Sequence, residues 1–328
     1  MVRPGSGKTA IPAHGVSNLL APGYLLRRPT LADAPGVLAL LAAVEIAEFG
    51  EPGDTSVEEL LEIWRRIDLA RDAWLVVAPD GCLAGYGFAR RRQIVRNDAE
   101  GYVHPAHQER GIGTTLVRRA EAWAREAVSL APAGAEVVVT NWLNAHNRAA
   151  CDLLEREGYR AVRAFWRMGI ALEPAPAPPS WPSGITVRTA AEVGEVRPFY
   201  ELVEAGMADH WGHLARPYDQ WVERRCGADF DPHLWFLLLA DEEPAAAVLC
   251  RSAAGTGWVD TLAVRRAWRQ QGLGSALLAL AFSALAQRGH THARLIVDAA
   301  NETGATRLYE RAGMRVEQEY AAYRKTLR

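Results

Sequence analysis

The most informative stretch of this 328-residue chain is Leu262-Ala-Val-Arg-Arg-Ala-Trp-Arg-Gln-Gln-Gly-Leu-Gly-Ser-Ala-Leu-Leu278. Its apolar start predicts a strand, and the alanines and leucines at helical spacing predict a helix after Gly272 and Gly274. Glycines let a backbone come close to a phosphate, and the first N–H groups of a helix have no partner inside it. The stretch therefore predicts a cradle for a phosphate anion, to which Arg269 adds a positive charge.

The chain carries this pattern twice. The earlier copy reads Tyr102-Val-His-Pro-Ala-His-Gln-Glu-Arg-Gly-Ile-Gly-Thr-Thr-Leu-Val117, and a predicted helix again follows the glycines. Similar elements flank both copies: a strand, two helices and a strand pair before, and a strand with a glycine-terminated helix after. The sequence therefore predicts two similar α/β halves in tandem.

The element order predicts a mixed sheet in each half, an α/β fold of the α+β type. Early strands joined by short turns favour antiparallel pairing, and the later strand-helix-strand segment favours a parallel crossover. We expect a strand or hairpin at Arg160–Leu172 to close the first half, and a strand pair at Arg315–Leu327 to close the second. The expected divisions are a disordered tail (1–22), an N-terminal domain (23–172), a Pro-rich linker (173–184) and a C-terminal domain (185–328).

Composition excludes several classes of function. With 49% hydrophobic residues and a net charge of -2, the chain can bury a core and has no general attraction to nucleic acid. No apolar run reaches the roughly 18 residues that span a bilayer. The tail contains Gly5-Ser-Gly-Lys-Thr9 but lacks the strand and earlier glycine of a phosphate loop, and it lacks the apolar core of a signal peptide.

Cysteine usage fits a reducing compartment. The four cysteines are scattered singly, which argues against a disulfide scaffold and a zinc site. His210 and His213 are spaced as a metal pair could be, but no third ligand is evident. We therefore expect a cytoplasmic protein without a metal, and without a membrane or nucleic-acid partner.

Both glycine turns resemble the Arg/Gln-x-x-Gly-x-Gly/Ala signature of the GNAT superfamily of acyl-CoA-dependent N-acetyltransferases, and the resemblance covers nearly the whole chain after the tail. It implies that acetyl-CoA, or another acyl-CoA, binds at the strand end, the turn and the helix start. In the second copy the implied residues are Leu262, Ala263, Val264, Arg269, Gln270, Gln271, Gly272, Leu273, Gly274, Ser275 and Asn301. In the first copy they are Gln108, Glu109, Arg110, Gly111, Ile112, Gly113 and Thr114.

The two halves differ at the position of the family's proton donor. The segment from Asn301 to Gly313 resembles the family segment whose tyrosine is the proposed general acid, and Tyr309 stands at that place. A phenol with an ordinary pKa of about 10 is protonated at neutral pH. The first half has Leu154 there, so the resemblance assigns the chemistry to the C-terminal half. The N-terminal half would then bind the cofactor or have only a structural role. For Tyr309, the alternative to proton donation is packing on the inner face of its helix.

The general base is less defined by the sequence. Where many family members carry a glutamate on the strand before the turn, this chain has Trp258 and Asn97. Asp260 lies two residues after Trp258 and, by strand alternation, on the same side. Asp298 is the other candidate. Alternatively, Asp260 is structural and a chain of water molecules carries the proton away.

The expected acceptor is the amine of a small molecule or peptide. His210 and Trp211 lie where the family forms its acceptor-site wall, so they either contact the acceptor or pack. The layout is similar to that of tandem family members that acetylate the cysteinyl amine of a sugar-inositol thiol precursor, while antibiotic amines and protein N-termini are alternatives. A non-catalytic acyl-CoA sensor is the alternative of another class, and the sequence leaves acyl length and oligomeric state open.

Overall fold

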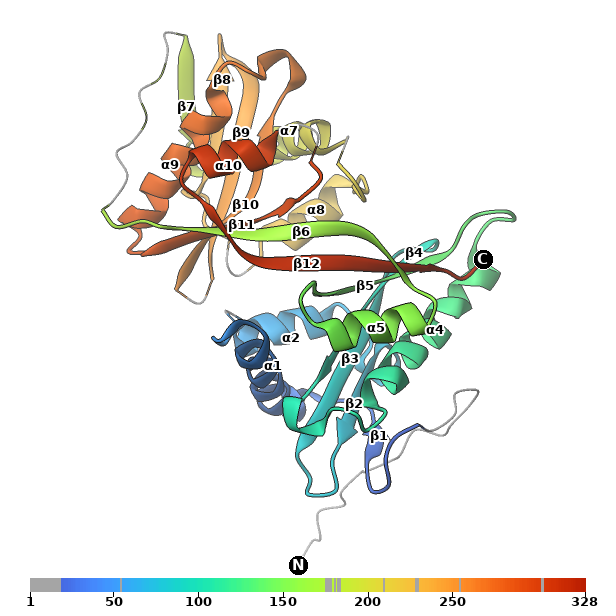
Figure 1. Ribbon diagram of the computed structural model, residues 1–328. Helices are drawn as coiled ribbons and strands as arrows, with labels where there is room; N and C mark the ends of the chain where they lie inside the picture. Colours follow the sequence, from blue (N-terminus) through green and yellow to red (C-terminus); the bar gives the residue numbers. More distant parts are fainter. Residues whose placement is uncertain are drawn as a thin grey trace, which may run out of the picture. The chain divides into compact units, whose positions relative to one another are not determined.

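The computed structural model describes residues 19–328 except 54, 175–178, 180, 182–183, 209, 228–229, 254 and 302–303. The chain forms two compact units, and Figure 1 labels their larger helices and strands. Unit 1 runs to Ala164 and includes Glu319–Arg328, and unit 2 comprises Phe165–Gln318. In the described part of the chain, no helix is long and apolar enough to cross a membrane.

Unit 1 is a sheet of order β1-β2-β3-β4-β5-β12 with helices on both faces. Its neighbours pair antiparallel except β4 and β5, which are parallel. The strands are β1 (Leu25–Arg27), β2 (Ala73–Val77), β3 (Leu83–Gln93), β4 (Arg96–Val103), β5 (Val138–Asn144) and the end of β12 (Arg315–Thr326). The helices are η1 (Leu31–Asp33), α1 (Ala34–Phe49), α2 (Val57–Arg65), α3 (Leu69–Asp72), η2 (Pro105–His107), α4 (Ile112–Leu130) and α5 (Arg148–Arg156).

Unit 2 repeats this design with the order β6-β11-β10-β9-β8-β7, in which β10 and β11 are the parallel pair. The strands are β6 (Arg160–Ala171), β7 (Ile185–Thr189), β8 (Trp235–Ala240), β9 (Glu243–Ala253), β10 (Thr256–Val264) and β11 (His292–Asp298). The helices are α6 (Ala190–Val193), α7 (Arg197–Met207), α8 (Tyr218–Arg225), η3 (Arg266–Trp268), α9 (Leu273–Gln287) and α10 (Ala305–Arg311).

Each unit is completed by a strand from the other half of the sequence. Residues Phe165–Ala171 of β6 pair antiparallel with β11 of unit 2, and Tyr320–Thr326 of β12 pair with β5 of unit 1. The prediction that Arg160–Leu172 closes the first half is therefore wrong, and so is the domain boundary at 172. The predicted strand pair at Arg315–Leu327 is one strand, β12. Period-two patterning marks a strand but does not say which sheet it joins, and the repeat supplies two equivalent partners.

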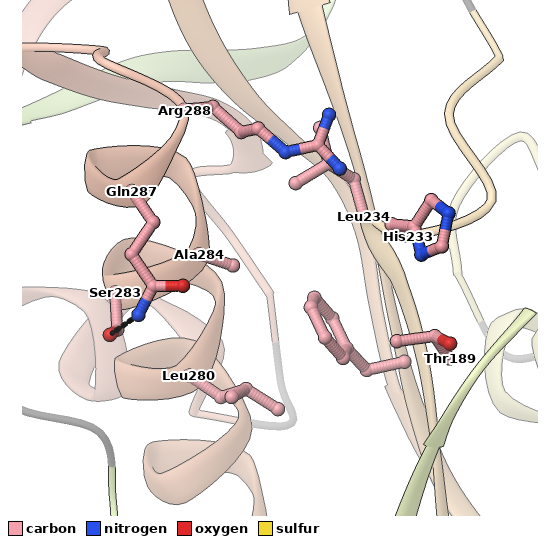
Figure 2. Close-up of a pocket in the computed structure, with 9 residues that line it drawn as sticks. Thr189, His233, Leu234, Leu280, Ser283, Ala284, Gln287 and Arg288 are labelled. Atoms are coloured by element: carbon pink, nitrogen blue, oxygen red, sulfur yellow. Dashed lines mark hydrogen bonds between the residues drawn. The ribbon is translucent and has the colours of Figure 1, made fainter. Parts of the chain in front are cut away.

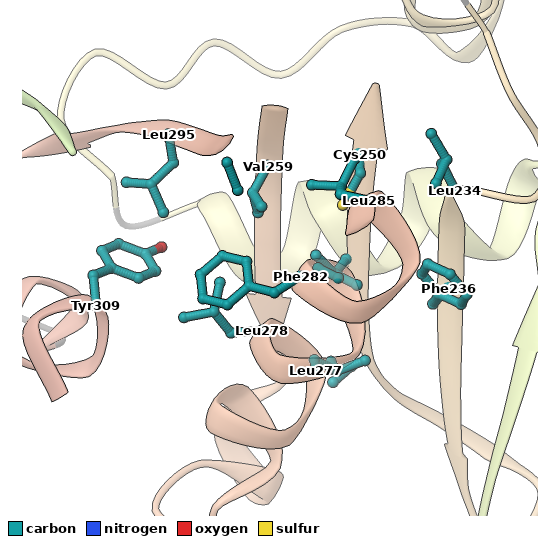
Figure 3. Packing of buried hydrophobic residues seen from close by; sticks show 14 of the residues in the cluster. Leu234, Phe236, Cys250, Val259, Leu277, Leu278, Phe282, Leu285, Leu295 and Tyr309 are labelled. Carbon is teal, nitrogen blue, oxygen red and sulfur yellow. The ribbon is translucent and has the colours of Figure 1, made fainter. Parts of the chain in front are cut away.

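Packing follows the alternation of side chains along the strands. In β8, Phe236 and Leu238 pack under α9 and α10, whereas Trp235 and Leu237 pack against α7 and α8 on the opposite face. Figure 3 shows the first of these two cores. Met168 of the exchanged strand β6 is fully buried in it, which contributes roughly 1.5–3 kcal/mol to holding β6 in unit 2.

Two of the expected helices differ from the structure. The first helix expected in the second half is interrupted at Gly194, which ends α6 in a left-handed conformation before α7 begins at Arg197. The second helix expected in the first half ends as α2 at Arg65, and α3 begins after its own Asp68 cap. Of the predicted tail and linker, residues 1–18, 175–178, 180 and 182–183 lie outside the described residues.

Candidate functional site

The parallel ladder at the centre of unit 2 is incomplete. Strands β10 and β11 share two register pairs, Gly257 with Ala293 and Trp258 with Arg294, and the ladder ends there. Both strands continue, because β10 stays paired with β9 as far as Val264 and β11 with β6 as far as Asp298. Backbone N–H and C=O groups of a central strand rarely stay unpaired, so this gap suits an extended ligand that carries amides.

The glycine turns of the two units have the same backbone conformation. Gln270 and Gly272 have φ of 62° and 79°, and Glu109 and Gly111 have φ of 59° and 75°. Positive φ at a non-glycine residue is uncommon and turns successive N–H groups towards one point, as in anion-binding nests. Helices α9 and α4 begin directly after these glycines. The predicted strand, turn and helix are confirmed in both halves, and anion binding there stays a prediction.

Arg269 has a structural role in the second turn. Its Nε donates a hydrogen bond to the backbone oxygen of Val264 at 3.1 Å, which ties the turn to the end of β10. Gln271 makes a similar bond from its side-chain amide to the oxygen of Ala267 at 3.2 Å. These bonds fix the turn at the end of the gap between β10 and β11.

The turn of unit 1 is covered by the chain's own N-terminal segment. A Cβ added to Gly111 would lie 1.9 Å from the carbonyl oxygen of Leu19, and Ala21 donates its N–H to the oxygen of Arg110 at 3.0 Å. At Gly272 in unit 2, no described heavy atom lies within 4 Å of the corresponding position. Residues 19–22 are thus ordered, contrary to the predicted tail, and nothing in their composition signals this contact.

Tyr309 is buried in unit 2. Its side chain points from α10 towards Phe282 and Leu278 of α9 and Leu295 of β11 (Figure 3), and it is 9% exposed. Burial raises its pKa to about 12. Among the described residues its hydroxyl has no hydrogen-bond partner. This hydroxyl is not among the fully buried side-chain atoms that lack a partner, so it keeps accessible surface where a ligand can bind.

Leu154 takes the corresponding place in unit 1. It follows Leu153 on α5 as Tyr309 follows Leu308 on α10, and it is buried at 4% exposure in the core of unit 1. The apolar side chain fills the space without offering a proton. The two halves thus carry different residues, Tyr309 and Leu154, at equivalent buried positions.

Asp260 stands at a bulge in β10. The β9–β10 register passes from Val259 to Thr261, which leaves Asp260 without a partner position. Its carboxylate lies 3.0 Å from Arg251 Nε and 3.9 Å from Arg225 Nη1, so two guanidinium groups compensate its charge. These contacts are those of a structural ion pair, and the role of Asp260 as base stays a prediction. Asp298, the other candidate, accepts the N–H of Ala300 at 3.0 Å in the turn after β11.

The structure brings Asn301 and the predicted acceptor residues together. The side-chain amide of Asn301 lies 3.4 Å from His210 Nε2, and the ring of Trp211 lies 5.9 Å from the ring of Phe165. Phe165 belongs to the exchanged strand β6, so a local sequence pattern could not place it here. His213, by contrast, pairs with Glu204 of α7 at 3.1 Å.

Unit 1 contains the same arrangement with different side chains. Asn147 donates to Glu48 Oε1 at 2.5 Å, and Phe49 lies 6.2 Å from Tyr320 of the exchanged strand β12. Burial raises the pKa of Glu48, and hydrogen bonds from Asn147 and Asn144 oppose that shift in part. Residues 48–50 and 210–212 hold equivalent places in the repeat, and no local sequence pattern predicts the asparagine contact.

A cavity of about 450 Å³ lies elsewhere in unit 2. It is bounded by α9, β8 and the residue before α6, and Figure 2 shows the polar and apolar side chains that line it. Its lining residues are Thr189, His233, Leu234, Phe236, Leu280, Ser283, Ala284, Gln287 and Arg288. None of the predicted site residues is among them. Within the described residues, no group of three side chains could hold a metal ion.

Comparison with known proteins agrees with the two-unit geometry. The family model described as "Acetyltransferase (GNAT) family" matches residues 39–159 and 197–314. The chain belongs to this family. It is a tandem GNAT enzyme, an N-acetyltransferase by family, because each unit carries its own match.

Several full-length relatives resemble the chain. A mycothiol acetyltransferase of Acidimicrobium ferrooxidans is 31% identical over 319 residues, which cover 90% of this chain and 94% of that protein. The crystal structure of a GCN5-related N-acetyltransferase from Sphaerobacter thermophilus is 39% identical with a TM-score of 0.84, covering 94% and 97% of the two chains. A tandem GNAT protein from the clavulanic acid biosynthesis pathway shares the fold, with a TM-score of 0.67 at 16% identity over 92% and 98% of the chains.

Proposed function

We propose that the protein transfers an acetyl group from acetyl-CoA to the amine of a small molecule, and that unit 2 carries out the reaction. The observation that carries this proposal is the gap between β10 and β11, which begins after Trp258 and leads to the open glycine turn. The buried phenol of Tyr309 belongs to α10, the helix that follows β11. Ligands of open α/β sheets bind at the carboxyl ends of parallel strands, where these features meet.

The residues of unit 2 fit acetyl-CoA by their chemistry. The N–H groups of the turn and of the first turn of α9, from Gln270 to Ser275, would hold the pyrophosphate. The backbone of β10 between Leu262 and Val264 would bond the amides of the pantetheine arm, as an added strand does. The bound thioester supplies an acyl group that an amine can attack.

Tyr309 would stabilise the sulfur that leaves. Its pKa of about 12 keeps the phenol neutral at physiological pH, so it can donate a hydrogen bond to a thiolate. Complete proton transfer to a thiolate whose thiol has a pKa of about 8.5 would be uphill by about 3.5 units, or about 5 kcal/mol. The hydrogen bond is therefore the main contribution of Tyr309, and it acts in the transition state, where the negative charge develops.

Unit 1 would not perform this transfer. Leu154 offers no proton, and the Leu19 carbonyl lies on the open side of its glycine turn. A carbonyl oxygen is a hydrogen-bond acceptor, as a phosphate oxygen is, and it would compete for the same approach. We therefore expect one acetyl-CoA per chain, bound by unit 2.

The acceptor we propose first is the cysteinyl amine of the sugar-inositol thiol precursor, the substrate of mycothiol synthase. The support is the resemblance to mycothiol acetyltransferases along nearly the full length of both chains. Trp258 stands where such enzymes of the family carry a carboxylate, so aminoglycosides, polyamines and peptide N-termini belong in the same comparison.

The test is CoA release from acetyl-CoA across this panel of amines. We expect turnover of one acceptor class by the wild type and by Gly113→Trp, whose change lies in unit 1, and none by Gly274→Trp. If Gly113→Trp abolished turnover and Gly274→Trp did not, unit 1 and not unit 2 would be the catalytic unit. Binding of acetyl-CoA without turnover of any amine would favour a non-catalytic acyl-CoA sensor.

A further inference from the structure

The two units share a contact that packing alone does not explain. Position 48 in unit 1 and position 210 in unit 2 are occupied by a glutamate and a histidine. Each is met by the asparagine that follows the last parallel strand of its unit, Asn147 at 2.5 Å and Asn301 at 3.4 Å. Glutamate and imidazole differ in shape, size and charge. What they have in common is the ability to accept a proton near neutral pH when the site favours it.

The backbone holds His210 firmly in place. Its N–H donates to the oxygen of Met207 at 2.9 Å, and its own oxygen accepts the N–H of His213 at 3.0 Å. Its Nδ1 has no contact with solvent, so Nε2, the nitrogen nearest to Asn301, is the atom that an acceptor could reach. The amide contact at 3.4 Å is near the limit of a hydrogen bond, and a closer amine would replace it.

We infer that His210 is the general base of unit 2, and that its Nε2 exchanges the Asn301 contact for the acceptor amine. This inference rests on the proposed acetyl transfer. The proton of the acceptor amine moves to Nε2 while the amine nitrogen forms a C–N bond to the acyl carbon. The C–S bond breaks as the tetrahedral species collapses, and the sulfur leaves with its electron pair, hydrogen-bonded by Tyr309. His210 then releases its proton to solvent or to the released thiolate, so protons and electrons balance.

Charged side chains on α7, β11 and β6 have partners of their own. On its own loop, His213 pairs with Glu204 of α7. At the end of β11, the carboxylate of Asp298 accepts a backbone N–H. On β6, Arg167 lies 3.4 Å from Glu317. An imidazole ordinarily has a pKa of about 6.5, which suits a base that must be neutral at physiological pH and charged after the transfer.

The test replaces His210 in two ways. His210→Gln keeps the size of a polar side chain but cannot accept a proton, and should lower kcat by about 100-fold or more while acetyl-CoA binding stays within about 2-fold of wild type. His210→Glu installs a carboxylate, the group that unit 1 carries at the equivalent position, and should restore at least a tenth of the wild-type rate. Its pH profile of kcat/KM should have an acidic limb at lower pH, because a carboxylate loses its proton below the pKa of an imidazole.

Two control variants test whether the proton goes to His210 and to no neighbouring group. His213→Gln changes the neighbouring histidine and should leave kcat within about 3-fold of wild type, because the ring of His213 already pairs with Glu204. Asp260→Asn should retain most of the wild-type rate. A collapse of kcat in Asp260→Asn with normal acetyl-CoA binding, or wild-type turnover by His210→Gln, would overturn the inference and leave the proposed function standing. An unmoved acidic limb in an active His210→Glu enzyme would also overturn it. The proposed function itself fails if the wild type acetylates no amine.

Discussion

Alanine substitutions at the two equivalent glycines should separate binding from stability. Gly111 and Gly272 both have a positive φ, so either alanine costs about 1 kcal/mol in backbone strain. In Gly111→Ala the new Cβ would also collide with Leu19, because the carbonyl oxygen lies 1.9 Å from its position. In Gly272→Ala the new Cβ meets no described atom within 4 Å and points into the space that a phosphate would use.

The size of each effect follows from these contacts. Moving the Leu19 segment away breaks the Ala21–Arg110 hydrogen bond, about 1 kcal/mol, and exposes part of Leu20, about another 1 kcal/mol. We therefore expect Gly111→Ala to lower the free energy of unfolding by about 3 kcal/mol with little effect on acetyl-CoA binding. Gly272→Ala should cost about 1 kcal/mol in stability and weaken acetyl-CoA binding at least tenfold, or about 1.4 kcal/mol.

Urea denaturation and isothermal titration calorimetry measure the two quantities. Gly134→Ala and Gly289→Ala are matched controls, because both glycines have positive φ and neither has a described atom within 4 Å of the added Cβ. They give the cost of strain alone in unit 1 and unit 2. We expect one acetyl-CoA per wild-type chain. Two sites in the wild type, or loss of binding in Gly111→Ala, would refute the view that unit 1 has a closed turn.

Two further predictions concern the rest of the chain. The guanidinium of Arg27 holds the pKa of Asp33 at about 2, against an ordinary 3.8. A depressed pKa stabilises the fold above the ordinary value, so Asp33→Asn should cost about 1 kcal/mol at pH 7, after allowance for solvent screening. This cost should shrink as the pH falls from about 4 towards 2, which urea melts at several pH values measure. An equal cost at low pH would contradict it. Cys82 is exposed whereas Cys250 is fully buried, and burial raises the pKa of Cys250. A thiol reagent should label Cys82 in the folded protein and Cys250 after unfolding, and equally fast labelling of Cys250 in the native state would contradict its placement.

The sequence was sufficient for features that depend on local pattern. The sequence predicts the glycine turns, the helices after them and the presence of Leu154 where the second half has Tyr309. Caps, periodicity and motif spacing act over a few residues, so a local pattern is enough to recognise them. The burial of Tyr309 agrees with either interpretation that the sequence allowed, packing or proton donation.

Features that depend on distant contacts could not be read in this way. Strands β6 and β12 are equivalent in the repeat, and no local signal says which unit each completes. The contact of Leu19 with Gly111 joins segments far apart in the chain, as does that of His210 with Asn301. Strand alternation placed Asp260 beside Trp258, but the bulge and the two arginines that engage Asp260 appear only in the folded sheet.

The most direct test of the central claim is the kcat of Tyr309→Phe with the acceptor that the wild type prefers. Removing one hydrogen bond to a developing charge should lower kcat by about 100-fold and leave acetyl-CoA affinity unchanged. Tyr159→Phe, which removes a buried hydroxyl in unit 1, should keep the wild-type kcat. A folded Tyr309→Phe enzyme with wild-type kcat would show that unit 2 does not use this phenol, and would contradict the account.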